Sequence, residues 1–213
     1  METMPLQLTD PSSLPAGALS VLQFWLGDVP LRDASALDKR QLWFTQSDAV
    51  DAEIRHQFAD LVNQAKAGEL DAWAQSPEGT LALLILLDQF TRNIGRGTPD
   101  SFAGDAKALA LAKLAIAQGG DSRVPPVARI FFYLPLEHAE DLACQDAAVA
   151  AFAQLTRQGD AASQGFLDMT HDYALRHRAV IAEFGRFPHR NAILGRASTP
   201  AEQAYLAQPG AGF

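Results

Sequence analysis

The amino-acid sequence predicts an all-α protein. It contains 38 alanines and 27 leucines against 8 valines and 7 isoleucines, so helix-forming residues far outnumber the β-branched residues that strands favour. Glycines follow the helix-like segments, where a left-handed residue ends a helix. These glycines are Gly27, Gly68, Gly95, Gly119, Gly159 and Gly185. Because 213 residues suffice for a sizeable core, we expect one helical domain over residues 16–213 behind a flexible head at 1–15.

The first part of this domain is predicted to contain three amphipathic helices. Two short ones carry the apolar residues of segments 21–26 and 37–44. The third lies behind Asp48 as a plausible N-cap and repeats apolar residues over 54–65 at helical spacing. A short turn around Trp73 follows.

The next helix is predicted to be central to the fold. It begins at Ser76-Pro77, a capping serine with proline at the first helical position. Residues 81–87 are apolar on every side, and a helix that is apolar all round belongs in the interior.

The second half of the chain continues the helical pattern. Pro135 is expected to interrupt a short piece that starts at Pro125-Pro126, and Thr199 to Glu202 form a capping box for a last helix. Residues 185–196 are predicted to form a structured loop. The other helices are expected over residues 101–118, about 137–157 and about 161–184.

Composition narrows the possible functions. The chain carries 17 basic and 25 acidic residues, a net charge of -8 and a pI of about 5.0, which disfavours binding to nucleic-acid phosphates. A mean hydropathy of -0.04 with 20% charged residues argues against a conventional membrane protein. The single cysteine, Cys144, cannot form an internal disulfide, and no leader-like segment opens the chain. We therefore expect a cytoplasmic protein that binds neither nucleic acid nor membranes.

The first candidate group of functional residues closes the predicted central helix. Asp88 and Arg92 stand at i, i+4 on one helix face, and Asn93 follows. If this helix end is buried, its charges need partners. A structural ion pair, with Arg92 near the negative helix end, is the simpler interpretation.

A second group runs from Tyr133 to Asp141. His138 and Asp141 share a helix face at i, i+3, and Glu140 lies between them. They form part of a metal shell or an acid–base couple at most, because a metal site requires three or four ligands. A hydrogen-bonded structural histidine and first-turn carboxylates explain the same pattern. We predict no bound metal and no cofactor.

The third group is an arginine-rich loop among apolar residues, with His177 on the preceding helix. An arginine fork matches carboxylate or phosphate oxygens. Salt bridges to the other two groups are the structural alternative. The loop residues are Arg186, His189, Arg190, Asn191 and Arg196.

Charge balance also favours an anion if the three groups converge. Five arginines, with Arg96 included, then face four carboxylates, with Glu137 included. Sharper motifs are absent: the chain has no phosphate loop, dinucleotide-type glycine triad, nucleophile elbow or cysteine pair. Cys144 stands in an alanine-rich segment and is interpreted as a small core residue.

Four blocks resemble the signatures of a bacterial domain-of-unknown-function family, number 924. They cover nearly the whole chain, and the resemblance implies a fold similar to tetratricopeptide-repeat (TPR) superhelices and no established activity. The family's polar positions match the residues singled out in the three groups above, apart from His177, and they also include Gln89. Thr91 and Glu137 depart from the family pattern, and Glu137 is therefore left out of the predicted site. The blocks are DQFTRN (88–93), RGTPDSFAGDA (96–106), FFYLPLEHAED (131–141) and FGRFPHRNAILGRAST (184–199).

Three functions remain open at this point. The first is binding of a small anion or an acidic peptide end through Arg92, Arg186 and Arg190. The binding protein would then be a right-handed superhelical array of antiparallel helix hairpins. The second is a hydrolase or lyase, with or without a metal, that uses His138 or His189 as general base beside Asp141 or Glu140. The third is a structural charge network without a ligand.

Overall fold

The structure, a computed structural model, describes residues 13–212. Every regular element in this range is helical and none is a strand, which confirms the all-α prediction. The expected head at 1–15 falls mostly on residues outside the described range. None of the described helices is both long enough and apolar enough to cross a membrane.

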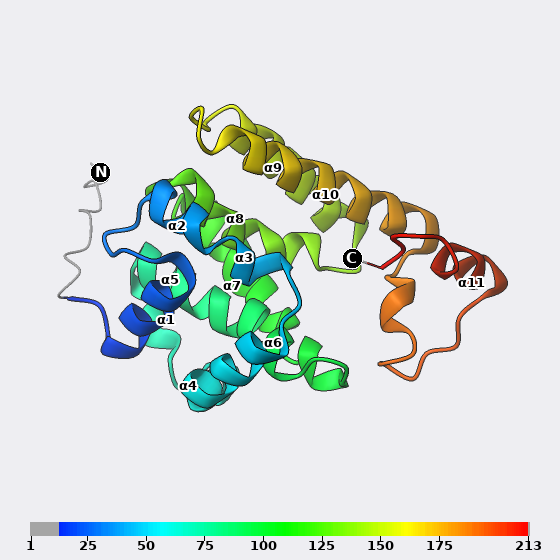
Figure 1. The fold of residues 1–213 in the computed structure, drawn as a ribbon, viewed down its shortest axis with the longest axis horizontal. Coiled ribbons are helices and arrows are strands. Elements are labelled where there is room, and N and C mark those ends of the chain that lie inside the picture. The colour runs from blue at the N-terminus through cyan, green and yellow to red at the C-terminus, as the bar shows by residue number, and fades with distance from the viewer. Residues whose placement is uncertain (1–12, 213) are drawn as a thin grey trace.

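Longer helices are joined by short helical turns (Figure 1). The first half contains α1 (Ala16–Leu26), α2 (Asp33–Lys39), α3 (Gln41–Phe44), α4 (Asp48–Ala67), η2 (Asp71–Gln75), α5 (Pro77–Leu84), η3 (Ile85–Phe90) and α6 (Thr91–Ile94). The second half contains η4 (Pro99–Phe102), α7 (Asp105–Ala117), η5 (Asp121–Arg123), α8 (Pro126–Glu137), α9 (Leu142–Thr156), α10 (Gln164–Phe184), η6 (Pro188–Arg190) and α11 (Pro200–Leu206).

The segment formed by α5, η3 and α6 is central, as predicted. Ser76 caps it by accepting a hydrogen bond from the Gly79 amide at 3.1 Å. Its side chains from Leu81 to Phe90 are buried on all sides and pack against α1, α4, α7 and α8. Phe90 meets the Trp25 ring of α1 edge-on, with a centroid distance of 5.2 Å. Burial of this continuous apolar segment stabilises the fold through the hydrophobic effect.

A π-helical turn, η3, replaces α-helix at the end of this central segment. The backbone amide and the hydroxyl of Thr91 both donate to the Leu86 carbonyl, the hydroxyl at 2.9 Å. The Leu86 carbonyl thus accepts from the residue five positions later, whereas in an α-helix it would accept from the residue four positions later. Such turns occur often at functional sites, and this one places Asp88 at the centre of the molecule.

Glycine at position 104 lets α7 approach the central segment closely. A β-carbon there would overlap the backbone carbonyl oxygen of Leu87 in η3. The contact brings the first residue of α7, Asp105, next to Arg92 of α6. The absence of a side chain at Gly104 therefore positions one carboxylate of the polar site.

Two element boundaries differ from the sequence prediction. Pro135 does not interrupt a helix but lies in the last turn of α8, where a missing N–H removes only one intrahelical bond. The next helix begins at Leu142 rather than near Glu137, because the Asp141 carboxylate accepts the Cys144 amide at 2.8 Å and caps it. At α4 the cap is Ser47, not the expected Asp48.

The C-terminal part is held to the rest by a helix hairpin and a loop. Helices α9 and α10 lie side by side along one edge (Figure 1), and α9 packs on α8. Gly185 ends α10 in the left-handed conformation, with φ at 69°. The following loop returns toward α8 and leads to α11, whose predicted capping box between Thr199 and Glu202 is present.

We predict that Gly104→Ala lowers the free energy of unfolding by more than about 2 kcal/mol, because the methyl group forces the backbones of α7 and η3 apart. The matched control is Gly165→Ala in α10, where a β-carbon meets no atom within 4 Å. This control should stabilise by about 0.5–1 kcal/mol. Urea unfolding checks both values, and equal effects of the two substitutions would contradict the proposed close approach.

Candidate functional site

The buried carboxylate of Asp88 lies at the centre of the polar site. Its side chain is 2% exposed. Its Oδ1 contacts His138 Nδ1 at 2.7 Å and Arg92 at 3.3 Å, and Gln89 Nε2 donates to its Oδ2 at 2.6 Å. Burial opposes ionisation, but His138 and Arg92 outweigh burial and hold the pKa of Asp88 well below its usual range. Asp88 is therefore a carboxylate at neutral pH.

This carboxylate determines which imidazole nitrogen of His138 carries the proton. Burial and the nearby Arg92 charge lower the pKa of His138, although Asp88 opposes them, so the imidazole is neutral at pH 7. An ionised Asp88 can only accept a hydrogen bond, which places the imidazole proton on Nδ1. Nε2 of His138 is then the basic nitrogen.

A second carboxylate, Asp105, bridges two arginines. Its Oδ1 accepts from Arg92 at 2.8 Å, and its Oδ2 meets Arg190 at the longer distance of 3.4 Å. The Arg190 guanidinium lies between two phenyl rings, 4.7 Å from the centroid of Phe102 and 4.6 Å from that of Phe187. Arginine interacts favourably with aromatic faces, so both rings contribute to the position of this guanidinium.

The hydrogen-bonding capacity of these two arginines is only partly used. Nε of Arg92 and Nε of Arg190 are both buried, and neither has a hydrogen-bond partner among residues 13–212. Burial lowers the pKa of Arg190 to about 10, with a further decrease from Arg92. The buried charge of Arg190 is thus only partly balanced, by one long contact with the Asp105 carboxylate.

Two other arginines of the loop are fully engaged as braces. Arg196 forms a two-pronged ion pair with Glu140, at 2.6 and 2.8 Å, and Glu140 also accepts the Phe187 amide. Arg186 pairs in the same way with the buried Glu202 of α11, at 2.6 and 2.9 Å. These pairs fix the loop that carries Arg190.

The remaining predicted residues lie around this arrangement. Asn191 is buried and donates to Glu202 and Ser198. Asn93 points the other way and donates to Asp51 of α4, which also pairs with Arg96. His189 packs its ring 5.5 Å from that of Phe187, and burial with nearby arginines lowers its pKa to about 4.

Asp141 does not join these contacts, because its carboxylate caps α9 as described above. The pairing of His138 with Asp141 expected from their spacing is replaced by the pairing of His138 with Asp88. The spacing was misleading because α8 ends before His138, so the two residues do not share a helix face.

A buried acid–imidazole pair lies next to the site. Glu137 Oε1 is 3.2 Å from His177 Nδ1, and the ring of His177 is 6.3 Å from that of His138. Burial, with a contribution from Asp88, raises the pKa of Glu137 to about 8. Burial and His138 lower the pKa of His177 to about 3. Both groups are therefore mainly neutral at pH 7 and do not form an ion pair. Nδ1 of His177 instead donates to the backbone carbonyl oxygen of Tyr173 at 2.9 Å.

The sequence was compared with known families and structures. The family described as "Bacterial protein of unknown function (DUF924)" matches residues 21–210. The chain belongs to this family. A solved structure of a protein of unknown function from Agrobacterium tumefaciens is similar, with 38% identity and a TM-score of 0.75 over 89% of this chain and 96% of the other. Curated proteins yield no match. The resemblance inferred from the four blocks is thus confirmed.

The sequence reasoning missed several site residues of this DUF924 protein. Asp105 was not considered, although it lies within the block RGTPDSFAGDA. Glu137 was left out as a departure from the family pattern, yet it is buried beside His177. Asp51 and Glu202 also pair with arginines of the network. The excess of positive charge expected from pooling residues is therefore absent, and the case for an anion depends on geometry.

Among residues 13–212 of this DUF924 protein, no three histidine, cysteine, aspartate or glutamate side chains form a cluster that could hold a metal. Asp88 and Asp105 are occupied by arginines and His138. The arrangement offers hydrogen-bond donors for an anion and one basic nitrogen, Nε2 of His138.

For this DUF924 protein we predict that stability falls as the pH rises from about 6.5 to 8. Glu137 keeps its proton in the folded state up to about pH 8 but loses it near 4.5 when unfolded, so folding binds extra protons between these values. His177 and His189, whose pKa values are lowered, act in the opposite direction below about pH 6.5. Above that pH, deprotonation of Glu137 should therefore lower the free energy of unfolding by up to about 1.4 kcal/mol per pH unit.

The variant Glu137→Gln keeps the shape of the side chain and removes its titration. We expect a flat stability profile for this variant between pH 6.5 and 8, measured by urea unfolding at each pH. Retention of the wild-type slope in the variant would show that another group is responsible.

Proposed function

We propose that this protein binds a small anionic ligand, or the acidic end of a peptide, at the edge of the Arg92 and Arg190 guanidiniums. The proposal rests on the Nε donors of these two arginines, which have no partner among residues 13–212, and on the carboxylate of Asp105 that the two arginines share. Buried donors without partners are costly, and an incoming carboxylate or phosphate would satisfy them.

Asp105 is interpreted as the group that an anionic ligand would compete with or replace. Its side chain is 23% exposed, and burial raises its pKa above the usual range despite Arg92. A carboxylate that is itself poorly stabilised costs little to displace from Arg190, where its contact is already long at 3.4 Å. Arg186 is left out of the contacts proposed here, because it already pairs with Glu202.

The helix architecture and the cellular location also form part of this proposal. The α9–α10 hairpin is consistent with a TPR-like array of helix pairs, and such arrays present concave binding surfaces. We also propose, from the acidic composition, that the protein acts in the cytoplasm on a ligand other than nucleic acid.

The variant Arg190→Met tests the binding proposal. Methionine fills the space between Phe102 and Phe187 but removes the donors, and Asp105 keeps Arg92 as its partner. We expect a Tm within about 4 °C of wild type, equivalent to about 1 kcal/mol in a chain of this size. Phosphate, citrate or short acidic peptides should raise the Tm of wild type but not of the variant, as measured by thermal melts.

The matched control for this test is Arg186→Met in the same loop. It breaks the ion pair with the buried Glu202 and should lower the Tm while keeping the shift produced by the anion. If Arg190→Met unfolds the protein and no anion stabilises wild type, the network is a structural brace and the binding proposal is wrong.

A second candidate function, acid–base catalysis, is supported by the pair formed by Asp88 and His138. A carboxylate 2.7 Å from Nδ1 orients the imidazole and leaves Nε2 as a general base. The arginines would stabilise developing negative charge. This assignment replaces the earlier choice of Asp141 or Glu140 as the carboxylate partner, because Asp141 caps α9 and Glu140 holds Arg196.

A panel of activated esters and phosphoesters tests the catalytic candidate. His138→Gln should reduce any turnover by at least about 100-fold, whereas His56→Gln at an exposed position of α4 should not. Because the pKa of His138 is lowered, the acid limb of the pH–rate profile should lie below the usual imidazole range. Equal turnover by the two variants would exclude His138 as the base.

A further inference from the structure

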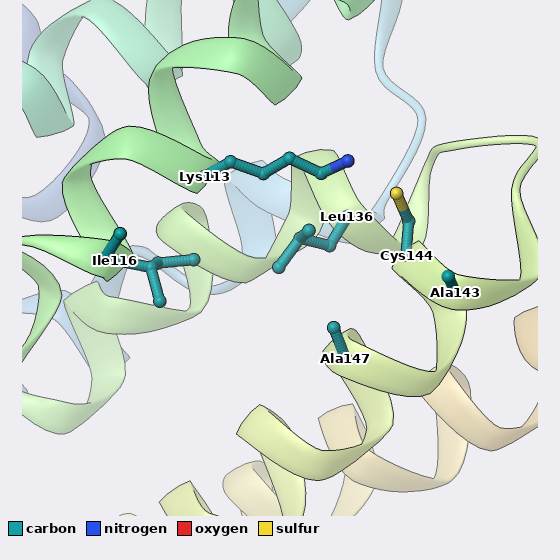
Figure 2. Close-up of a pocket in the computed structure, with 7 residues that line it drawn as sticks. Lys113, Ile116, Leu136, Ala143, Cys144 and Ala147 are labelled. Carbon is teal, nitrogen blue, oxygen red and sulfur yellow. The ribbon is translucent and has the colours of Figure 1, made fainter.

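A groove lies between α7 and α9, and its lining residues do not belong to the arginine site. Both helices pack on α8, and a groove of about 300 Å³ remains between them. Leu136 of α8 forms part of its lining, Lys113 and Ile116 come from α7, and Ala143 and Ala147 from α9 (Figure 2). Its volume is at the lower end of the range for small-molecule sites.

The lining of the groove is almost entirely apolar. Small alanine side chains on α9 leave the space that a larger residue would fill. Leu136 is buried, whereas Ala143 and Ala147 are exposed at the surface of α9. An apolar chain placed here would remove these surfaces from water, which is favourable in proportion to the area covered.

Lys113 is the one charged residue in this lining. Within residues 13–212 no carboxylate lies at ion-pair distance from its amine, in contrast to Lys107 of the same helix, which pairs with Asp71 at 2.6 Å. The Lys113 charge does act on Asp141 across the groove, but that carboxylate accepts the Cys144 amide. The Cys144 thiol of the same lining also interacts with the Lys113 amine. A thiol is a weak hydrogen-bonding partner, which a ligand carboxylate would replace.

We propose that the groove between α7 and α9 binds a small carboxylic acid with an unbranched aliphatic chain, its chain against Leu136, Ala143 and Ala147 and its carboxylate at Lys113. The inference goes beyond the function proposed above, because none of the groove residues belongs to the arginine site. An apolar wall with one cationic end matches the two parts of such a ligand.

Octanoate is the probe for this proposal, with binding followed by isothermal titration calorimetry. We expect saturable binding to wild type and its loss in Ala147→Leu, which places a larger side chain in the groove where the aliphatic chain would lie. Leucine is a good helix former at an exposed position of α9, so this variant should stay folded. The matched control is Ala150→Leu, one turn further along α9 and outside the lining, which should bind octanoate as wild type does.

The head-group contact is tested with Lys113→Met and with octanol. Lys113→Met should weaken octanoate about fivefold, the contribution of an exposed ion pair at the upper end of its range. Octanol should bind wild type and Lys113→Met equally, and less tightly than octanoate binds wild type. Octanol binding to wild type as tight as octanoate would overturn the carboxylate assignment.

Two further outcomes would overturn the groove itself as the site. One is the absence of octanoate binding to wild type at millimolar concentration, and the other is unchanged binding in Ala147→Leu. If Arg190→Met rather than Ala147→Leu abolishes octanoate binding, the ligand occupies the arginine site. The two proposals are separable, because Ala147→Leu should leave stabilisation by phosphate or citrate unchanged.

Discussion

The architecture of the polar site depends on a carboxylate, Asp88, buried at the end of the most apolar segment of the protein. A charge in this position is tolerated only with close partners. Two of its partners, Gln89 and Arg92, belong to the same helical segment, and the third, His138, lies at the end of α8. Satisfying this one group therefore brings together α6 and the turn that follows α8.

The C-terminal loop completes the site through a different set of interactions. Glu140 and Glu202 hold Arg196 and Arg186 with paired hydrogen bonds, and such charge-assisted pairs give strong orientation. Because these braces fix the loop, Arg190 can be held between Phe102 and Phe187 with few hydrogen bonds of its own. The division between engaged and unused arginines distinguishes a binding proposal from a purely structural network.

Neutral buried groups limit the electrostatic cost of this arrangement. Glu137 and His177 are both uncharged near pH 7, although a carboxylate and an imidazole 3.2 Å apart could form an ion pair. Desolvation outweighs their attraction, since each group is more stable neutral when buried. The remaining charges at the centre are two carboxylates and two guanidiniums, so an added anion would bind to a site without net charge and would be recognised by donor geometry.

Local sequence patterns alone determined the helical class, the central helix after Ser76 and the capping box at Thr199, because capping and periodicity depend on neighbouring residues. Four signature blocks also identified the family and most of the polar residues. Only the tertiary structure decided which charges meet. Asp105 reaches Arg92 through the close approach at Gly104, and His138 meets Asp88 rather than Asp141 because α8 ends before it. These two pairings join residues 13 and 50 positions apart, separations at which spacing along the chain carries no information about distance in space.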